Sequence, residues 1–113
     1  MHFLSLQSHV AYGYVGNRAA TFPLQRLGHE VWAVNTVEFS NHTGYGAWRG
    51  RVAPADQVGD IVHGIEALGL LNRCDALLTG YVGDAALADV VLDTARRNGC
   101  GSSPPRRCWG GAR

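Results

Sequence analysis

The sequence predicts an α/β fold, a mostly parallel sheet covered by helices on both faces in a three-layer αβα sandwich. Apolar stretches rich in strand-forming residues occur at residues 3–6, 31–39 and 76–78. A segment with helical features follows each stretch, and this alternation implies parallel pairing with right-handed crossovers. The length of 113 residues provides for one hydrophobic core and one domain.

Composition and charge exclude several functional classes. Ten basic and nine acidic residues give a net charge of +1, without the strongly basic face of a nucleic-acid binder. All ten basic residues are arginine, which excludes a P-loop and a Schiff-base lysine. Cys74, Cys100 and Cys108 form no CxxC pair, and no two histidines lie four residues apart on one helix. We therefore predict no metal site.

The chain is expected to be cytoplasmic, without a membrane partner. The N-terminal segment lacks a positively charged region, and Gln7, Ser8 and His9 interrupt its apolar stretch, which is unlike a signal peptide. The sequence has no run of about 18 apolar residues, so no membrane-spanning helix is predicted. The odd number of cysteines favours a reducing compartment.

The first half of the chain divides into strand, loop, helix, strand and loop. The first strand precedes the loop SHVAYGYVGN, in which Asn17 is a candidate N-cap of a helix that Gly28 closes. Pro23 lies inside this helix and is expected to kink it. The second strand leads into FSNHTGYGAWRG, whose three glycines and lack of a regular period predict a loop.

Apolar stripes and capping residues define the second and third helices. Pro54 is placed to start the second helix, and Asp84 is a candidate cap of the third, which ends at residues 98–99. Asp93 and Arg97 are four residues apart and form a favourable pair. The stripes consist of Val58, Ile61, Val62, Ile65 and Leu68 in the second helix and Leu87, Val90, Val91 and Ala95 in the third.

Residues 99–113 depart from this pattern. They contain no Val, Ile, Leu or Phe at the point where a fourth buried strand is due. We therefore predict an unstructured tail after residues 1–98. The tail is dominated by Gly, Pro and Arg, which use GC-rich codons, so its composition is typical of a frameshift in a GC-rich gene. A genuine disordered tail is the alternative.

Polar side chains follow each predicted strand, at the edge of the sheet where parallel α/β folds bind ligands. Ser8, Thr43 and Tyr81 supply three hydroxyls there, and Tyr81 also offers a ring for stacking. Simpler roles are a turn cap for Ser8 and a local backbone hydrogen bond for Thr43. His9 and His42 lie in the same loops and could meet, although loop packing explains either one. These residues predict a ligand-binding edge.

Gly13 and Gly16 stand between a strand and a helix, and Glu38 stands near the end of the next strand, which imitates a dinucleotide-binding fingerprint. The match is poor, because residues 8–12 intervene where Gly13 should directly follow the strand, and one of the three glycines is missing. Glycines that let a loop turn are the simpler interpretation. Cys74, at the start of a strand, is expected to be a small core residue.

The segments QSHV, GNRAATFPLQRLG, FSNHTGYGAWRG and CDALLTGYVG resemble segments of the pyridoxal kinases. The resemblance covers residues 3–98 and implies the N-terminal part of a ribokinase-like domain. The implied activity is transfer of the γ-phosphate of ATP to the 5′-hydroxyl of pyridoxal or a related vitamin B6 form. A divalent cation, usually Mg²⁺, and a cytoplasmic homodimer are implied as well.

The resemblance also implies substrate-binding roles at six positions. Ser8 matches a serine that hydrogen-bonds the pyridine ring, Thr43 a threonine that contacts polar substituents, and Tyr81 an aromatic residue that packs on the ring. The other three, two apolar wall residues and a neighbour of Thr43, are Val15, Phe39 and Gly44.

The sequence departs from the family in its catalytic segments. It has no Asp-Pro pair and no GTGD segment, to which the resemblance assigns the metal, the phosphates and the general base. No residue is therefore assigned a catalytic role, and residues that bind ATP or Mg²⁺ are expected to be absent. We predict an inactive chain of marginal stability, because a truncated sheet exposes an edge. The alternatives are a non-catalytic module that binds a pyridoxal-like ligand, and a dinucleotide-binding oxidoreductase.

Overall fold

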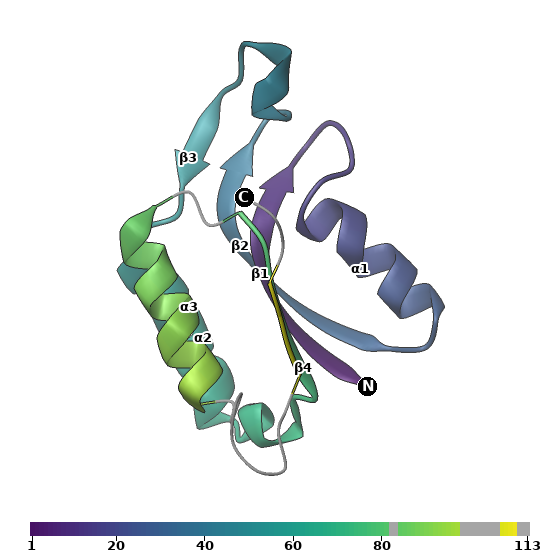
Figure 1. The fold of residues 1–113 in the computed structure, drawn as a ribbon, viewed down its shortest axis with the longest axis vertical. Helices are drawn as coiled ribbons and strands as arrows, with labels where there is room; N and C mark the ends of the chain where they lie inside the picture. The colour runs from purple at the N-terminus through teal and green to yellow at the C-terminus, as the bar shows by residue number, and fades with distance from the viewer. Residues whose placement is uncertain (82–83, 98–106, 111–113) are drawn as a thin grey trace.

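The computed structural model describes residues 1–81, 84–97 and 107–110, which form a five-stranded sheet with helices on both faces (Figure 1). The strands are β1 (His2–Val10), β2 (Glu30–Phe39), β3 (Gly50–Val52), β4 (Ala76–Thr79) and β5 (Arg107–Gly110). The helices in these ranges are α1 (Asn17–Arg26), α2 (Ala55–Ala67) and α3 (Ala85–Arg97), with short 3-10 turns η1 (Thr43–Tyr45) and η2 (Leu70–Arg73).

The sheet is mostly parallel, in the order β3-β2-β1-β4-β5. The central strand β1 pairs in parallel with β2 and β4, and β4 pairs in parallel with β5. The edge strand β3 is antiparallel to β2 and begins at Gly50, the last residue of the predicted loop. Helix α1 covers one face, and α2 and α3 lie together over the other (Figure 1). The predicted three-layer α/β class is confirmed.

The hydrophobic core lies between the sheet and the α2–α3 pair. Leu4 and Leu6 face it from β1 because side chains alternate across a strand. Cys74 is fully buried in this core, as predicted. The buried members are Leu4, Leu6, Val34, Val58, Val62, Leu71, Cys74, Leu77 and Leu87. Full burial of one aliphatic side chain contributes about 1.5–3 kcal/mol relative to exposure, so this cluster is the main source of stability.

Helices α2 and α3 begin where the sequence predicts. Pro54 occupies the N-cap position of α2, and the Asp84 carboxylate accepts a hydrogen bond from the Ala86 amide at 3.0 Å. The predicted stripe of α2 is too wide, because Ile61 and Leu68 are 43% and 76% exposed. Only a narrow side of the helix contacts the sheet and α3, so the outer members of the stripe remain in solvent.

Asn17 does not cap α1, contrary to the prediction. Gly16 occupies the N-cap position, and the structure assigns it no side-chain capping bond. The Asn17 side chain is 3% exposed and points into the sheet. It accepts a hydrogen bond from the Ser5 hydroxyl at 2.6 Å and donates to the Val34 carbonyl at 3.1 Å and the Asn35 side chain at 2.8 Å. Three partners on the sheet satisfy this amide better than one helix-end amide does.

The prediction of an unstructured tail is wrong over residues 107–110, which form β5 beside β4. A parallel ladder joins backbone amides and carbonyls, so it forms without the apolar side chains on which the prediction relied. The rest of the predicted tail, residues 99–106 and 111–113, and the predicted end of α3 at residues 98–99 lie outside the described residues. No helix in the described part of the chain has the length and hydropathy to cross a membrane.

Candidate functional site

The carboxyl ends of β1, β2 and β4 surround a pocket of about 560 Å³. In Figure 1 the arrowheads of β1 and β2 point to this end of the sheet. We call it the strand-end pocket. It is lined by Gln7, Ser8, Val10, Val15, Gly16, Val37, Phe39, His42, Thr43, Gly80 and Tyr81. A pocket at this edge agrees with the general position of ligand sites in parallel α/β sheets.

The structure brings five of the six predicted substrate-binding residues to this one pocket. They are Ser8 on β1, Val15 in the following loop, Phe39 at the end of β2, Thr43 in η1, and Tyr81 after β4. The sixth, Gly44, does not line the pocket. It follows Thr43 in η1, and its amide donates to Nδ1 of His42 at 3.0 Å.

The Ser8 hydroxyl is the most informative polar group of the pocket. Ser8 is 9% exposed, and the structure shows no hydrogen bond from its hydroxyl to any described residue. A buried polar group without a partner costs roughly 1–3 kcal/mol, so natural folds leave few of them. A ligand with a complementary polar atom would remove this cost.

His42 lines the pocket, although the sequence marked it only as a loop histidine. Its Nδ1 accepts from the Gly44 amide, so the neutral ring carries its proton on Nε2 and has a donor left for a ligand. The suggested meeting of His9 and His42 does not occur in one pocket. His9 instead lines a separate groove beside α1.

The strand that leads to Tyr81 is held by residues the sequence did not single out. The Thr36 hydroxyl donates to the Tyr81 carbonyl at 2.7 Å, and the Gly80 amide donates to the Leu6 carbonyl at 3.2 Å. Gln7 packs so closely on Gly80 that a Cβ there would lie 2.7 Å from the Gln7 amide oxygen. The one sequence signal for this arrangement is Gly80, which directly follows the strand.

The pocket carries no carboxylate and no guanidinium among its described lining residues. Its polar groups are hydroxyls, one amide and one imidazole, set among Val, Phe and Tyr side chains. Such a lining suits a flat, weakly charged ring that bears polar substituents. It lacks the charged groups that phosphoryl transfer requires to stabilise phosphates.

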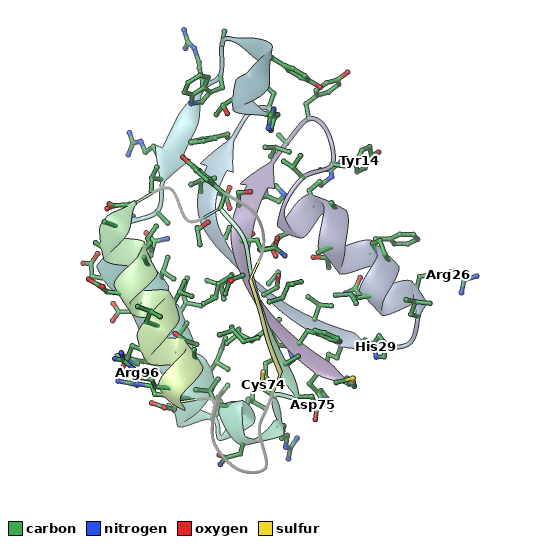
Figure 2. All side chains as sticks on the ribbon, in the orientation of Figure 1. Tyr14, Arg26, His29, Cys74, Asp75 and Arg96 are labelled. Carbon is green, nitrogen blue, oxygen red and sulfur yellow. The ribbon has the colours of Figure 1, made fainter. Side chains whose placement is uncertain are left out.

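The described residues contain no group of three or more His, Cys, Asp or Glu side chains that could hold a metal ion. Among the residues that the structure describes, Asp75 is the carboxylate with a shifted pKa, and it lies at the end of the sheet away from Tyr14 (Figure 2). Glu38 is likewise absent from the pocket lining, and its carboxylate accepts from the Asn35 side chain at 2.9 Å. The dinucleotide-binding hypothesis therefore gains no support from the described geometry.

Comparison with characterised proteins gives one consistent result. No family model matches the chain. The chain is 58% identical over 97 residues to pyridoxal kinase PdxY of Corynebacterium diphtheriae, covering 86% of this chain and 34% of that protein. It is 55% identical over 95 residues to pyridoxal kinase PdxY of Pasteurella multocida, covering 84% and 33%. The chain thus spans about a third of the length of these relatives.

Solved structures agree with the sequence comparison. The pyridoxal kinase of Leishmania donovani in complex with ADP and pyridoxamine has a TM-score of 0.82 and 42% identity, over 87% of this chain and 34% of that one. The pyridoxal kinase of Trypanosoma brucei has a TM-score of 0.84 and 34% identity, over 96% and 40%. In sequence and in fold, this chain is therefore related to about one third of a pyridoxal kinase.

Proposed function

We propose that this chain forms the vitamin-binding part of a pyridoxal kinase, which transfers the γ-phosphate of ATP to the 5′-hydroxyl of pyridoxal in vitamin B6 salvage. The observation that carries the proposal is the buried Ser8 hydroxyl, which faces a pocket lined by apolar and hydroxyl side chains. The names of the relatives, and pyridoxamine in a related structure, support the same ligand class.

The pocket would bind the vitamin ring by burial and orientation. Val15 and Phe39 form apolar walls, and the Tyr81 ring offers a stacking surface. Ser8 and Thr43 would bond the polar atoms of the ring, which fixes its rotation within the pocket. Fixed orientation of the 5′-hydroxyl is the contribution that phosphoryl transfer needs from this part of an enzyme.

The residues present do not fit a role in holding ATP or Mg²⁺. The sequence has no Asp-Pro pair and no GTGD segment, and its described residues hold no metal-ligating group of three. A related structure binds ADP, but over a length almost three times that matched here. We propose that this chain binds the vitamin and does not phosphorylate it. From the resemblance alone, we also propose that the protein is cytoplasmic and that the kinases of this family form homodimers.

Binding of pyridoxine to the purified chain tests the proposal. Pyridoxine has no aldehyde, so it cannot form a Schiff base with the terminal amine, and the chain has no lysine. We expect saturable binding by calorimetry and no ATP-dependent formation of pyridoxine phosphate. NAD, tested in parallel, should not bind. Absence of saturable pyridoxine binding would overturn the vitamin site, and phosphate transfer would overturn the non-catalytic assignment.

The variant Ser8→Ala tests whether pyridoxine binds in the strand-end pocket. We expect it to lower pyridoxine affinity about fivefold to tenfold, because one ligand hydrogen bond is worth about 1 kcal/mol. Stability should not fall, since the hydroxyl has no partner among the described residues. Ser5→Ala is the matched control. The Ser5 hydroxyl is fully buried between Asn17 and Gln7, so its loss should lower the melting temperature. Equal pyridoxine affinity of Ser8→Ala and the wild type would contradict the assignment.

A further inference from the structure

Thr36 forms a hydrogen bond that crosses the central strand of the sheet. It lies on β2, and its hydroxyl donates at 2.7 Å to the carbonyl of Tyr81, which follows β4. Strands β2 and β4 are not neighbours, because β1 lies between them. The bond therefore ties together two of the three strand ends that surround the strand-end pocket.

The Thr36 donor is itself held rigidly. Thr36 is fully buried, and its backbone carbonyl accepts from the Ala53 amide at 2.8 Å, at the start of the segment that leads into α2. Its side chain is β-branched, which restricts rotation about χ1. The hydroxyl thus occupies a fixed position from which it can orient a neighbouring peptide.

Tyr81, by contrast, is only partly covered by the rest of the fold. The residue is 46% exposed, and its ring makes no aromatic contact with the described residues. Two hydrogen bonds hold the backbone of residues 80–81 beside the pocket. The Gly80 amide bonds the Leu6 carbonyl at 3.2 Å, and the Tyr81 carbonyl bonds Thr36. Removing the second bond frees the peptide that determines where the ring points.

We propose that Thr36 is a positioning residue that holds Tyr81 over the strand-end pocket and so sets its affinity for an aromatic ring. This inference rests on the proposed function, because it takes the vitamin ring as the ligand that Tyr81 contacts. Thr36 lines no part of the pocket, and it acts through the Tyr81 backbone. Sequence patterns do not reveal it, since a buried threonine is ordinary in a strand.

The test compares Thr36→Val, which keeps the shape and removes the donor, with Thr36→Ser, which keeps the donor. We expect Thr36→Val to weaken pyridoxine binding about fivefold to tenfold, on the scale of one lost hydrogen bond. Thr36→Ser should restore most of the affinity. If Thr36 contributed to stability alone, pyridoxine affinity would not depend on whether residue 36 carries a hydroxyl. Recovery of affinity in Thr36→Ser therefore distinguishes a positioning role from a purely structural one.

Thr94→Val is the matched control. Thr94 is 1% exposed on α3, and its hydroxyl also donates at 2.7 Å to a backbone carbonyl, that of Val90. Thr94→Val should lower stability to a degree similar to Thr36→Val, while its pyridoxine affinity stays that of the wild type. Equal affinities of Thr36→Val and Thr94→Val would overturn the positioning role.

A readout without ligand separates this inference from the proposed function. Hydrogen exchange of residues 80–81 in the free protein should accelerate in Thr36→Val and not in Thr36→Ser or Thr94→Val. If the wild type binds no pyridoxine, the proposed function fails, and this exchange still decides whether Thr36 holds Tyr81. Unchanged hydrogen exchange of residues 80–81 in Thr36→Val would show that Thr36 does not hold the Tyr81 backbone.

Discussion

Gly16 lies closer to Ser8 than any amino acid with a Cβ could at this position. Its φ of 56° and ψ of −134° lie in a region that residues with a Cβ rarely adopt. A Cβ at this position would lie 2.2 Å from the Ser8 carbonyl oxygen and 2.4 Å from the Ser8 hydroxyl. Gly16 therefore sets how near the start of α1 approaches β1, and with it one wall of the strand-end pocket.

Gly16→Ala should lower stability by about 1–3 kcal/mol, because it combines backbone strain with a steric clash. Pyridoxine affinity should fall as well, since the clash displaces Ser8. The midpoint of thermal unfolding, measured in an osmolyte that favours the folded state, checks the first effect. Gly13→Ala is the control. Gly13 has a φ of 100°, but a Cβ there meets no atom within 4 Å. Equal losses in both variants would show that the contact with Ser8 is unimportant.

At the residue scale, the sequence could predict which side chains gather but not how they are held. Ser8, Thr43 and Tyr81 follow strands, and parallel strands end at one edge, so their meeting is a consequence of topology. Thr36 bonds a residue 45 positions later, and no local pattern encodes such a pair. The predicted capping role of Asn17 is wrong for the same reason, because its partners lie on strands that only the fold brings near.

At the scale of elements, His2 joins the amino end of β1 to both neighbouring strands. Its amide donates to the Asp75 carboxylate at 2.8 Å, just before β4. Its ring lies 3.5 Å from the same carboxylate and 3.3 Å from that of Glu30 on β2. The backbone hydrogen bond from His2 is the main cause that holds the pKa of Asp75 below its usual value near 3.8. The bond and the His2 ring outweigh the opposing effect of partial desolvation.

This lowered pKa predicts a loss of stability in acid. The carboxylate of Asp75 favours the folded state above about pH 4, because the unfolded chain binds its proton more readily. The contribution is lost as the pH falls through the lower pKa of the folded state. The melting temperature of Asp75→Asn should therefore approach that of the wild type between pH 4 and pH 2, after lying below it at pH 6.

Asp60→Asn provides the control for this pH dependence, because Asp60 is exposed on α2. The melting temperatures of Asp60→Asn and the wild type over the same pH series give the baseline for the loss of one surface carboxylate. A difference between Asp75→Asn and the wild type that is constant from pH 6 to pH 2 would contradict the role of the Asp75 carboxylate. Both comparisons are made in the same buffers, since surface pairs are sensitive to salt.

The elements differ in how well the sequence could predict them. The strands β1, β2 and β4 follow from apolar stretches, and the helices α2 and α3 follow from apolar stripes and capping residues. Helix α1 lies where it was predicted, although Gly16 and not Asn17 occupies its N-cap position. The edge strands β3 and β5 do not, because backbone pairing with β2 and β4 creates them rather than any pattern of their own. Four residues of β5 pair with β4 from a segment that composition alone marks as unstructured.

At the scale of the whole molecule, the described structure leaves a large amount of apolar surface in water. Its exposed large hydrophobic residues come from α1, the loops and the outer sides of α2 and α3. Those at least 60% exposed are Tyr12, Tyr14, Phe22, Leu27, Tyr45 and Leu68. The relatives are about three times as long as the matched region. Exposed apolar patches are typical of surfaces that other protein segments cover.

This surface predicts marginal stability for the 113-residue chain by itself. Burial of apolar area is the main favourable term in folding. Here the burial comes from one modest cluster, and it must offset the entropy lost when the chain becomes ordered. We expect a broad, weakly cooperative thermal transition and binding of the dye ANS at low temperature. Pyridoxine should narrow the transition and raise its midpoint, because a ligand that binds only the folded state stabilises it. A sharp thermal transition of the chain in the absence of pyridoxine, together with no binding of ANS, would show that the exposed apolar residues do not limit the stability of this fold.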